Sequence, residues 1–115
     1  MTLGRKYLVP LKQEFARIRR GGKMYDSPSF GMLVAYGTSG RPQCAFIVSK
    51  KIDRRSVVRH EVKRKLSDTV QPFLPRLPKN LELVFLAKPK AVTISKDELY
   101  QEVLAILNRA RLTLS

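Results

Sequence analysis

Cations are concentrated in one segment of the sequence, KKIDRRSVVRHEVKRK, at residues 50–65. Arg59 and Lys63 are four residues apart, which places them on one flank of a helix. Like charges at this spacing oppose helix formation by about 0.2–0.5 kcal/mol per pair, so a helix that carries them is expected to meet a polyanion. Because arginine and lysine bind phosphate oxygens, the segment predicts contact with nucleic acid. The residues predicted to make it are Lys50, Lys51, Arg54, Arg55, Arg59, His60, Lys63 and Arg64.

Aromatic side chains offer a second kind of contact with RNA. Unpaired bases stack on aromatic rings and on guanidinium planes. Phe15, Phe30, Tyr36 and Phe46 fall on elements that are expected to lie near the basic segment. For each phenylalanine, an ordinary position in the hydrophobic core is the alternative interpretation.

Residues that would let the protein itself catalyse a reaction are sparse. The chain has one histidine, His60, and one cysteine, Cys44, and it has no glycine-rich phosphate loop. A helix-surface position without a chemical task is an equally good interpretation of His60. The acids nearest the basic segment are expected to balance its charge rather than to hold a metal; they are Asp26, Asp53, Glu61 and Asp68. We therefore predict no catalytic and no metal site on the protein.

Composition limits the class of protein. A chain of 115 residues with 43% hydrophobic residues is expected to form one folded domain, residues 1–115. Lysine and arginine number 23 against 9 acids, a net charge of +14 that attracts phosphate backbones or anionic membranes. The clustering of that charge favours nucleic acid. Cys44, in an apolar run, is expected to be buried, and a single cysteine suits a reducing compartment. No apolar stretch has the length of a signal peptide or membrane span, so the predicted location is the cytoplasm.

Hydrophobic periodicity predicts the elements that position these residues. An amphipathic helix is expected at 11–20, ended by Gly21 and Gly22, and a short strand is an option near Met24. Strands are expected at 30–36, 43–49 and 81–87, the last of them central because it is almost wholly apolar. The basic helix is expected at 54–73, and the final helix starts at the capping pair Ser95 and Glu98. The predicted class is α+β, in the order α-β-β-α-β-α with the option of the extra strand.

The run VSKK at residues 48–51, followed by SVVR and then VKR, resembles the signature of the bacterial ribonuclease P protein subunit. The order of the remaining elements is similar to that family over most of the chain. The resemblance implies an α/β sandwich in which the central helix makes a left-handed crossover between parallel strands, against the usual right-handed rule. It implies two RNA partners, ribonuclease P RNA and precursor tRNA with its 5′ leader, and magnesium ions held mainly by RNA. No membrane and no obligate protein partner is expected.

The resemblance also assigns roles to individual residues. Lys50 and Lys51 match the lysine pair of the family, Arg59 the first arginine of its basic motif, and Lys63 and Arg64 the basic pair that follows. A cleft for the leader, between the sheet and the first helix, is expected to be lined by Phe15, Arg19, Phe30 and Phe46.

Four positions depart from the family pattern. His60 stands in place of asparagine, Glu61 in place of arginine, Ser67 in place of a basic residue, and Arg19 in place of a second cleft aromatic. Losing cations at Glu61 and Ser67 is expected to weaken phosphate contacts on that face. Two other functions are weighed against the family role: a ribosomal or RNA-chaperone type of binding module, and a protein-only nuclease, which the composition disfavours.

Overall fold

The computed structural model describes residues 8–9 and 11–112, except for the side chains of residues 11–13. This part of the chain forms three α-helices, four strands and two short 3₁₀ helices. In order they are α1 (Leu11–Gly21), β1 (Lys23–Asp26), β2 (Phe30–Tyr36), β3 (Gln43–Ile47), α2 (Ser56–Val70), η2 (Gln71–Arg76), β4 (Leu81–Ala87), η3 (Pro89–Val92) and α3 (Lys96–Arg109). The predicted α+β class and order are confirmed, and β1 is the extra strand expected near Met24.

The four strands form one sheet in the order β1-β2-β4-β3. β2 is antiparallel to β1 and to β4, whereas β3 and β4 are parallel. β4 therefore has a neighbour on both sides, as its nearly continuous apolar sequence predicts. Beyond β3, Leu8 forms a parallel bridge to Cys44, and the amide of Val9 donates to the carbonyl of Cys44 at 3.0 Å.

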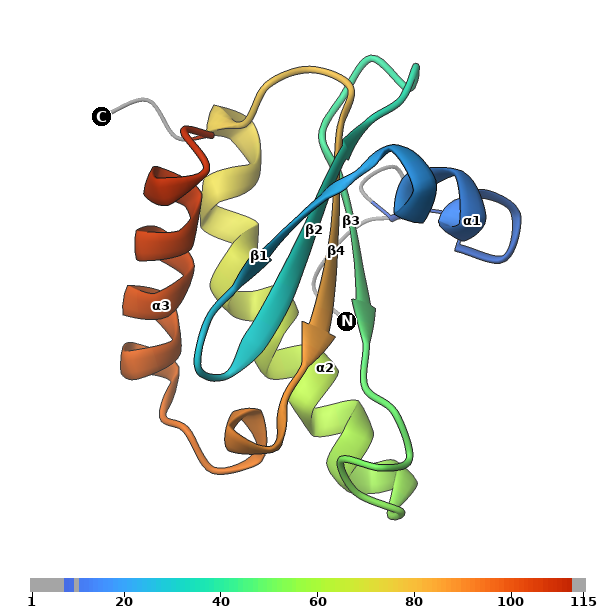
Figure 1. Ribbon diagram of the computed structural model, residues 1–115. Coiled ribbons are helices and arrows are strands. Elements are labelled where there is room, and N and C mark those ends of the chain that lie inside the picture. Colours follow the sequence, from blue (N-terminus) through green and yellow to red (C-terminus); the bar gives the residue numbers. More distant parts are fainter. Residues whose placement is uncertain (1–7, 10, 113–115) are drawn as a thin grey trace.

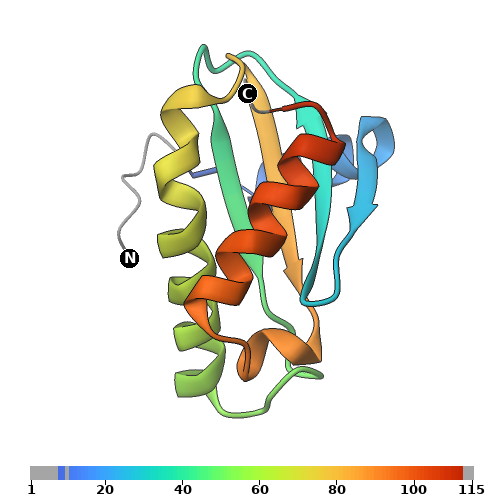
Figure 2. The ribbon, with the colours of Figure 1, turned by 90° about the vertical axis from the view of Figure 1, so that its left-hand side faces the viewer.

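The connection from β3 through α2 to β4 has the left-handed geometry that the resemblance implies. In Figure 1 both strands run downward, β4 lies to the left of β3, and α2 passes behind the sheet. Figure 2, a quarter turn away, places α2 and α3 on one side of the sheet and α1 on the other. The handedness matters because it sets which sheet face the basic helix covers.

The two faces of the sheet bury different amounts of apolar surface. On the face covered by α2 and α3, strand residues such as Met32, Cys44 and Leu83 join helix residues such as Leu66 and Val103 in a large core. On the other face, Ile18 of α1 packs over a small core that includes Leu33, Ala45 and Val84. Strand residues alternate between these cores with the period of two that a pleated strand imposes.

Local sequence signals explain where the helices end. The hydroxyl of Ser95 accepts a hydrogen bond from the amide of Glu98 at 3.2 Å, which is the predicted cap of α3. After α1, a Cβ on Gly22 would lie 2.5 Å from the carbonyl oxygen of Ile18, so only glycine fits there. α2 is shorter than predicted, because residues 71–76, with Pro72 and Pro75, form the 3₁₀ helix η2. No helix in the described part of the chain is long and apolar enough to cross a membrane.

Candidate nucleic-acid interface

The lysine pair after β3 occupies the corners of a tight turn. The amide of Ile52 donates to the carbonyl of Ser49 at 3.0 Å, which makes Lys50 and Lys51 the two central residues. Val48 before the turn is buried and Ile52 after it packs against the main core. The core therefore holds both ends of the turn, while the two lysine side chains are exposed.

Arg59 holds the segment that follows this turn. Its Nη1 donates to the carbonyl oxygens of Asp53 at 3.1 Å and Arg54 at 2.7 Å. Its side chain is only partly exposed. The predicted RNA-binding residue thus also ties the start of α2 to the loop that carries the lysines, a role that its place on the helix flank did not reveal.

Two further predicted cations, Arg54 and Arg55, differ in their surroundings. Both are exposed, but Arg55 is paired with Asp53, with Nη2 at 2.9 Å from Oδ2. The side-chain and backbone hydrogen bonds from Arg55 lower the pKa of Asp53 to about 2. Asp53 therefore stays ionised at neutral pH and offsets the charge of Arg55, whereas Arg54 has no ion pair within the described residues.

The outward side of α2 combines charges of both signs. His60, Glu61 and Arg64 line a shallow hollow of about 430 Å³ together with Ser56 and Val57. Val57 is 68% exposed and adds an apolar group to this hollow. Glu61 lines the same hollow as His60 and Arg64, two predicted RNA-binding residues. That Glu61 weakens phosphate contact on this face stays a prediction.

Two positions on α2 have roles that the sequence did not predict. The ammonium of Lys65 donates to the carbonyls of Ile94 at 2.8 Å and Val92 at 3.4 Å, and burial lowers its pKa. Lys63, on the flank away from these contacts, is partly exposed.

Ser67 is fully buried and its hydroxyl donates to the carbonyl of Arg64 at 3.0 Å. The expectation that Ser67 removes a cation from an RNA-facing surface is therefore wrong, because the side chain faces inward.

The first helix and the sheet form the second predicted surface. Phe15 is partly buried against the small core, and Arg19 is exposed on the same helix. Ile47 of β3 and Leu86 of β4 also pack there and remain partly exposed. Sequence reasoning did not assign these two residues, although the apolar residues on both faces of their strands were the available signal.

Phe30 and Phe46 do not line this surface, contrary to the prediction. Both belong to the core beneath α2 and α3, where they are 0% and 7% exposed. Phe46 stacks on Phe85 at 5.5 Å between ring centroids, and Phe30 meets Phe85 edge-on at the same distance. The physical reason is strand alternation: Ala45 and Ile47 face α1, so Phe46 must point to the opposite face.

An ion pair holds α1 on the sheet. Nη2 of Arg17 donates to both carboxylate oxygens of Glu82 at 2.9 Å, and its Nε donates to Glu14 at 2.6 Å. Glu82, the second residue of β4, is 4% exposed, and Arg17 supplies the guanidinium that pairs with its buried carboxylate. Hydrogen bonds to Glu14 and Glu82 raise the pKa of Arg17. Gly37 leaves room for the carboxylate, since a Cβ there would lie 2.6 Å from Glu82 Oε2.

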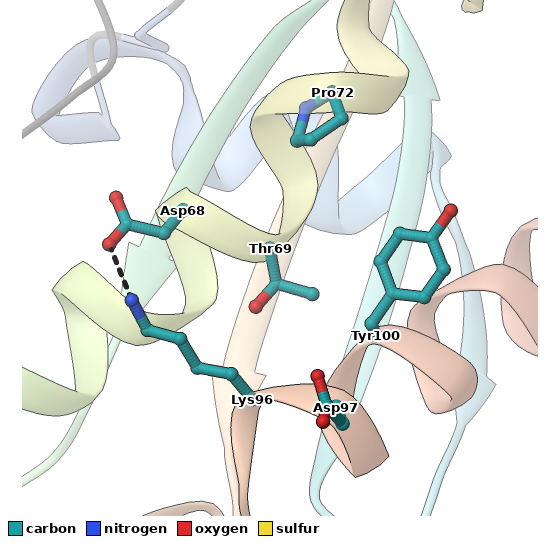
Figure 3. Close-up of a pocket in the computed structure, with 6 residues that line it drawn as sticks. All are labelled: Asp68, Thr69, Pro72, Lys96, Asp97 and Tyr100. Atoms are coloured by element: carbon teal, nitrogen blue, oxygen red, sulfur yellow. Dashed lines mark hydrogen bonds and ion pairs between the residues drawn. The ribbon is translucent and has the colours of Figure 1, made fainter.

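A hollow of about 240 Å³ between α2 and α3 contains none of the predicted RNA-binding residues. Figure 3 shows Lys96 reaching Asp68 across it, with Asp97 and Tyr100 on the α3 side. The Lys96 ammonium lies 3.2 Å from the Asp68 carboxylate. Two carboxylates and a cation that is already paired give this hollow little attraction for RNA phosphates.

Metal ligands do not converge in the described part of the chain. No group of three or more histidine, cysteine, aspartate or glutamate side chains there has the geometry to hold a metal ion. Cys44 is buried, and burial raises the pKa of its thiol to about 12, so it stays protonated at neutral pH. Within residues 8–9 and 11–112, the carboxylates, the histidine and the cysteine are therefore too far apart to form a ligand set for magnesium.

Comparison with known proteins gives consistent results at the level of sequence. The sequence model of the family described as "Ribonuclease P" matches residues 3–111. The ribonuclease P protein component of Chloroflexus aurantiacus is 28% identical over 107 residues, covering 92% of this chain and 78% of that protein. The corresponding protein of Roseiflexus castenholzii is 29% identical over 110 residues and covers 92% and 87%.

Solved structures share the fold. The RNase P protein of Staphylococcus aureus superposes with a TM-score of 0.81 at 16% identity, covering 94% of this chain and 98% of that one. The RNase P protein of Thermotoga maritima gives a TM-score of 0.78 at 18% identity and covers 89% and 96%.

Proposed function

Because this chain belongs to the ribonuclease P protein family, we propose that it binds the catalytic RNA of that endoribonuclease and the 5′ leader of precursor tRNA. Proteins of this family are components of an enzyme that contains ribonuclease P RNA. In this proposal the protein binds and positions RNA, and the RNA subunit carries the catalytic centre. No observation on this chain favours a ribosomal or RNA-chaperone role over the family role.

The observation that carries the proposal is the Lys50–Lys51 turn. Two adjacent ammonium groups project from a turn whose flanks, Val48 and Ile52, are fixed in the core. Neither lysine forms an ion pair within the described part of the chain, so binding of phosphates breaks no internal contact. Arg59 fixes the next residues by binding two backbone carbonyls. Preorganised, unpaired cations of this kind suit a folded RNA with a dense phosphate backbone.

The α1 face of the sheet is the proposed site for the leader. Phe15, Ile47 and Leu86 present partly exposed apolar groups beside the exposed guanidinium of Arg19. Unpaired bases stack on aromatic rings and also on guanidinium planes, so Arg19 can replace an aromatic residue in this role. The contact is expected to tolerate different leader sequences, because stacking requires only the flat face of a base.

Magnesium is proposed to act on the RNA side of the complex. Among the described residues no cage for a cation is formed, and the acids near the basic segment are paired or exposed singly. A cationic protein that screens phosphate repulsion is expected to lower the magnesium concentration needed for cleavage.

Reconstitution tests the proposal directly. Cleavage of precursor tRNA by a bacterial ribonuclease P RNA is measured at low magnesium, with and without the protein, on substrates with long and trimmed leaders. We expect strong stimulation that declines when the leader is trimmed. Intact RNA binding without stimulation would contradict the proposal and favour a differently partnered RNA-binding module.

A pair of variants locates the RNA contact. Lys50→Gln combined with Lys51→Gln is expected to reduce affinity for the RNA subunit by about tenfold or more at moderate salt, since each phosphate contact contributes about one unit to the salt dependence. Lys23→Gln combined with Lys90→Gln removes the same charge from exposed sites elsewhere and serves as the control. Equal losses from both pairs would indicate a nonspecific effect of net charge.

A further inference from the structure

One end of the molecule has cations but no acids. The β2–β3 connection (residues 37–42), the segment from η2 to β4 (residues 71–80) and the end of α3 with residues 110–112 contain no aspartate or glutamate. Figure 1 shows these connections at the top of the sheet, opposite the β3–α2 connection at the bottom. The nine acids of the chain lie in other segments: Glu14, Asp26, Asp53, Glu61, Asp68, Glu82, Asp97, Glu98 and Glu102. Of these, Glu82 reaches this end, because it lies near the start of β4 with its carboxylate beside Gly37, but it is paired with Arg17.

A cavity of about 580 Å³ opens at this acid-free end. Its floor is apolar, with the buried Leu77 and Leu112, and its rim carries the exposed cations Arg76, Lys79 and Arg111. None of these three cations forms an ion pair within the part of the chain that the structure describes. By contrast, cations such as Arg17, Arg55 and Lys96 elsewhere on the surface are held by carboxylates.

The backbone at the rim is held in an unusual conformation. Arg111 has φ of 59°, in the left-handed region that favours glycine. Its amide donates to the carbonyl of Asn108 at 3.0 Å and that of Leu112 to the carbonyl of Leu107 at 2.9 Å, the pattern with which glycine commonly closes a helix. An arginine here costs backbone energy, and its guanidinium is exposed on the rim. That combination indicates a task for the side chain rather than for the turn.

The opposite side of the same end is also fixed. Asn80 has φ of 66°; its side-chain Oδ1 accepts from the amide of Gly40 at 2.6 Å and its carbonyl accepts from the amide of Gly37 at 2.7 Å. These bonds tie the β2–β3 connection to the residue that follows Lys79. Lys79 and Arg111 therefore extend from backbone segments that hydrogen bonds hold in place.

We propose that Arg76, Lys79 and Arg111 form a second binding site for the phosphodiester backbone of the RNA subunit, at the end of the sheet opposite the Lys50–Lys51 turn. Phosphates bind the three rim cations, and a sugar or base lies on the apolar floor. The two arginine guanidinium planes also allow base stacking. The inference rests on the proposed function for the identity of the RNA. It adds that the protein connects two separate RNA segments rather than holding one.

Salt dependence of binding tests this site. The affinity of the RNA subunit alone is measured from 0.05 to 0.4 M salt for the protein and for the triple variant Arg76→Gln, Lys79→Gln, Arg111→Gln. We expect the affinity at moderate salt to fall by about tenfold or more and the slope of log K against log salt to decrease by about two to three. The control is Arg20→Gln, Lys23→Gln, Lys90→Gln, which removes equal charge from exposed sites elsewhere that have no ion pair within the described residues.

Arg111→Gly separates binding from folding. Glycine relieves the left-handed backbone, so the melting temperature is expected to stay equal or rise while RNA affinity falls several-fold. A triple variant that behaves like its control, or that loses retention on phosphatidylglycerol vesicles but not on RNA, would overturn the inference. If the Lys50/Lys51 variant weakens RNA binding and the triple variant does not, only this inference fails. If the unmodified protein does not bind the RNA, the proposed function fails.

Discussion

The two faces of the sheet differ in how they are held and in what they leave exposed. On the face beneath α2 and α3, the three phenylalanine rings of Phe30, Phe46 and Phe85 pack together in a continuous core. On the α1 face the core is small, and a salt bridge between Arg17 and Glu82 supplements it. Partly exposed apolar groups remain on this second face. The comparison indicates that one face provides most of the stability and the other is available for binding.

The cations follow a similar division. The side chains of Lys65, Arg59 and Arg17 donate hydrogen bonds to carbonyl or carboxylate oxygens of the protein itself. Lys50, Lys51 and the rim residues of the acid-free end do not. The net charge of +14 does not show which cations are available to RNA, whereas the internal contacts separate the cations that the protein holds from those that it leaves exposed.

The largest expected effect is on stability, through the large core beneath α2 and α3. Phe85→Ala is expected to lower the free energy of unfolding by about 3–5 kcal/mol, because it removes a fully buried ring that contacts two others. Denaturant unfolding followed by circular dichroism measures it. A loss below about 1 kcal/mol would show that this face does not dominate stability.

The second largest effect is expected from the salt bridge between Arg17 and Glu82 on the α1 face of the sheet. Arg17→Met is expected to lower the free energy of unfolding, though by less than Phe85→Ala, because the carboxylate of Glu82 is left buried without its donor. Adding Glu82→Leu is expected to recover part of the loss, which a double-mutant cycle in denaturant would detect. If the double variant is no more stable than Arg17→Met, the stability lost by Arg17→Met does not come from leaving the Glu82 carboxylate without its partner.

Phe15→Ala makes the counterpart of the Phe85 substitution on the other face. Since Phe15 is only partly buried, its loss is expected to cost about 1–2 kcal/mol, less than the cost at Phe85. Stimulation of precursor tRNA cleavage should fall mainly for substrates with a long leader. An equal fall with a trimmed leader would argue against a leader site on this face.

The smallest effect is expected at a hydrogen-bonded contact between α3 and the turn that connects β1 to β2. Glu102 of α3 accepts from the hydroxyls of Ser27 and Ser29 at 2.6 and 2.8 Å and from the amide of Ser29 at 2.9 Å. Burial acts to raise its pKa, but these bonds outweigh it and lower the pKa below the ordinary 4.5. Glu102→Gln is expected to cost about 1 kcal/mol at neutral pH.

The pH dependence of that contact has a definite sign. A depressed carboxyl pKa stabilises the fold above the ordinary value, and the contribution is lost as pH falls through the folded-state pKa. The stability of the unmodified protein should therefore decline more steeply below about pH 4.5 than that of Glu102→Gln. Parallel stability curves for the two proteins from pH 7 to 3 would contradict this assignment.

The sequence alone determined the local structure, since each signal depends on residues close together in the chain. The Ser95 cap, the glycines after α1, the apolar stripe of α2 and the central strand β4 all follow from short-range spacing. The resemblance to a known family supplied the left-handed crossover, which residue patterns do not encode. Periodicity does not set the end of α2, because the prolines at 72 and 75 end the α-helix but permit its continuation as the 3₁₀ helix η2.

Only the tertiary structure decided which face each side chain takes. Strands with apolar residues on both faces carry no amphipathic signal, so Phe30 and Phe46 were assigned to the wrong side. Arg17 meets Glu82 across 65 positions of sequence, and Arg76 and Lys79 share a cavity with Arg111 only because α3 ends beside η2. Sequence spacing fixes neighbours along a helix or strand, whereas contacts between elements depend on how the sheet twists and which face each helix covers.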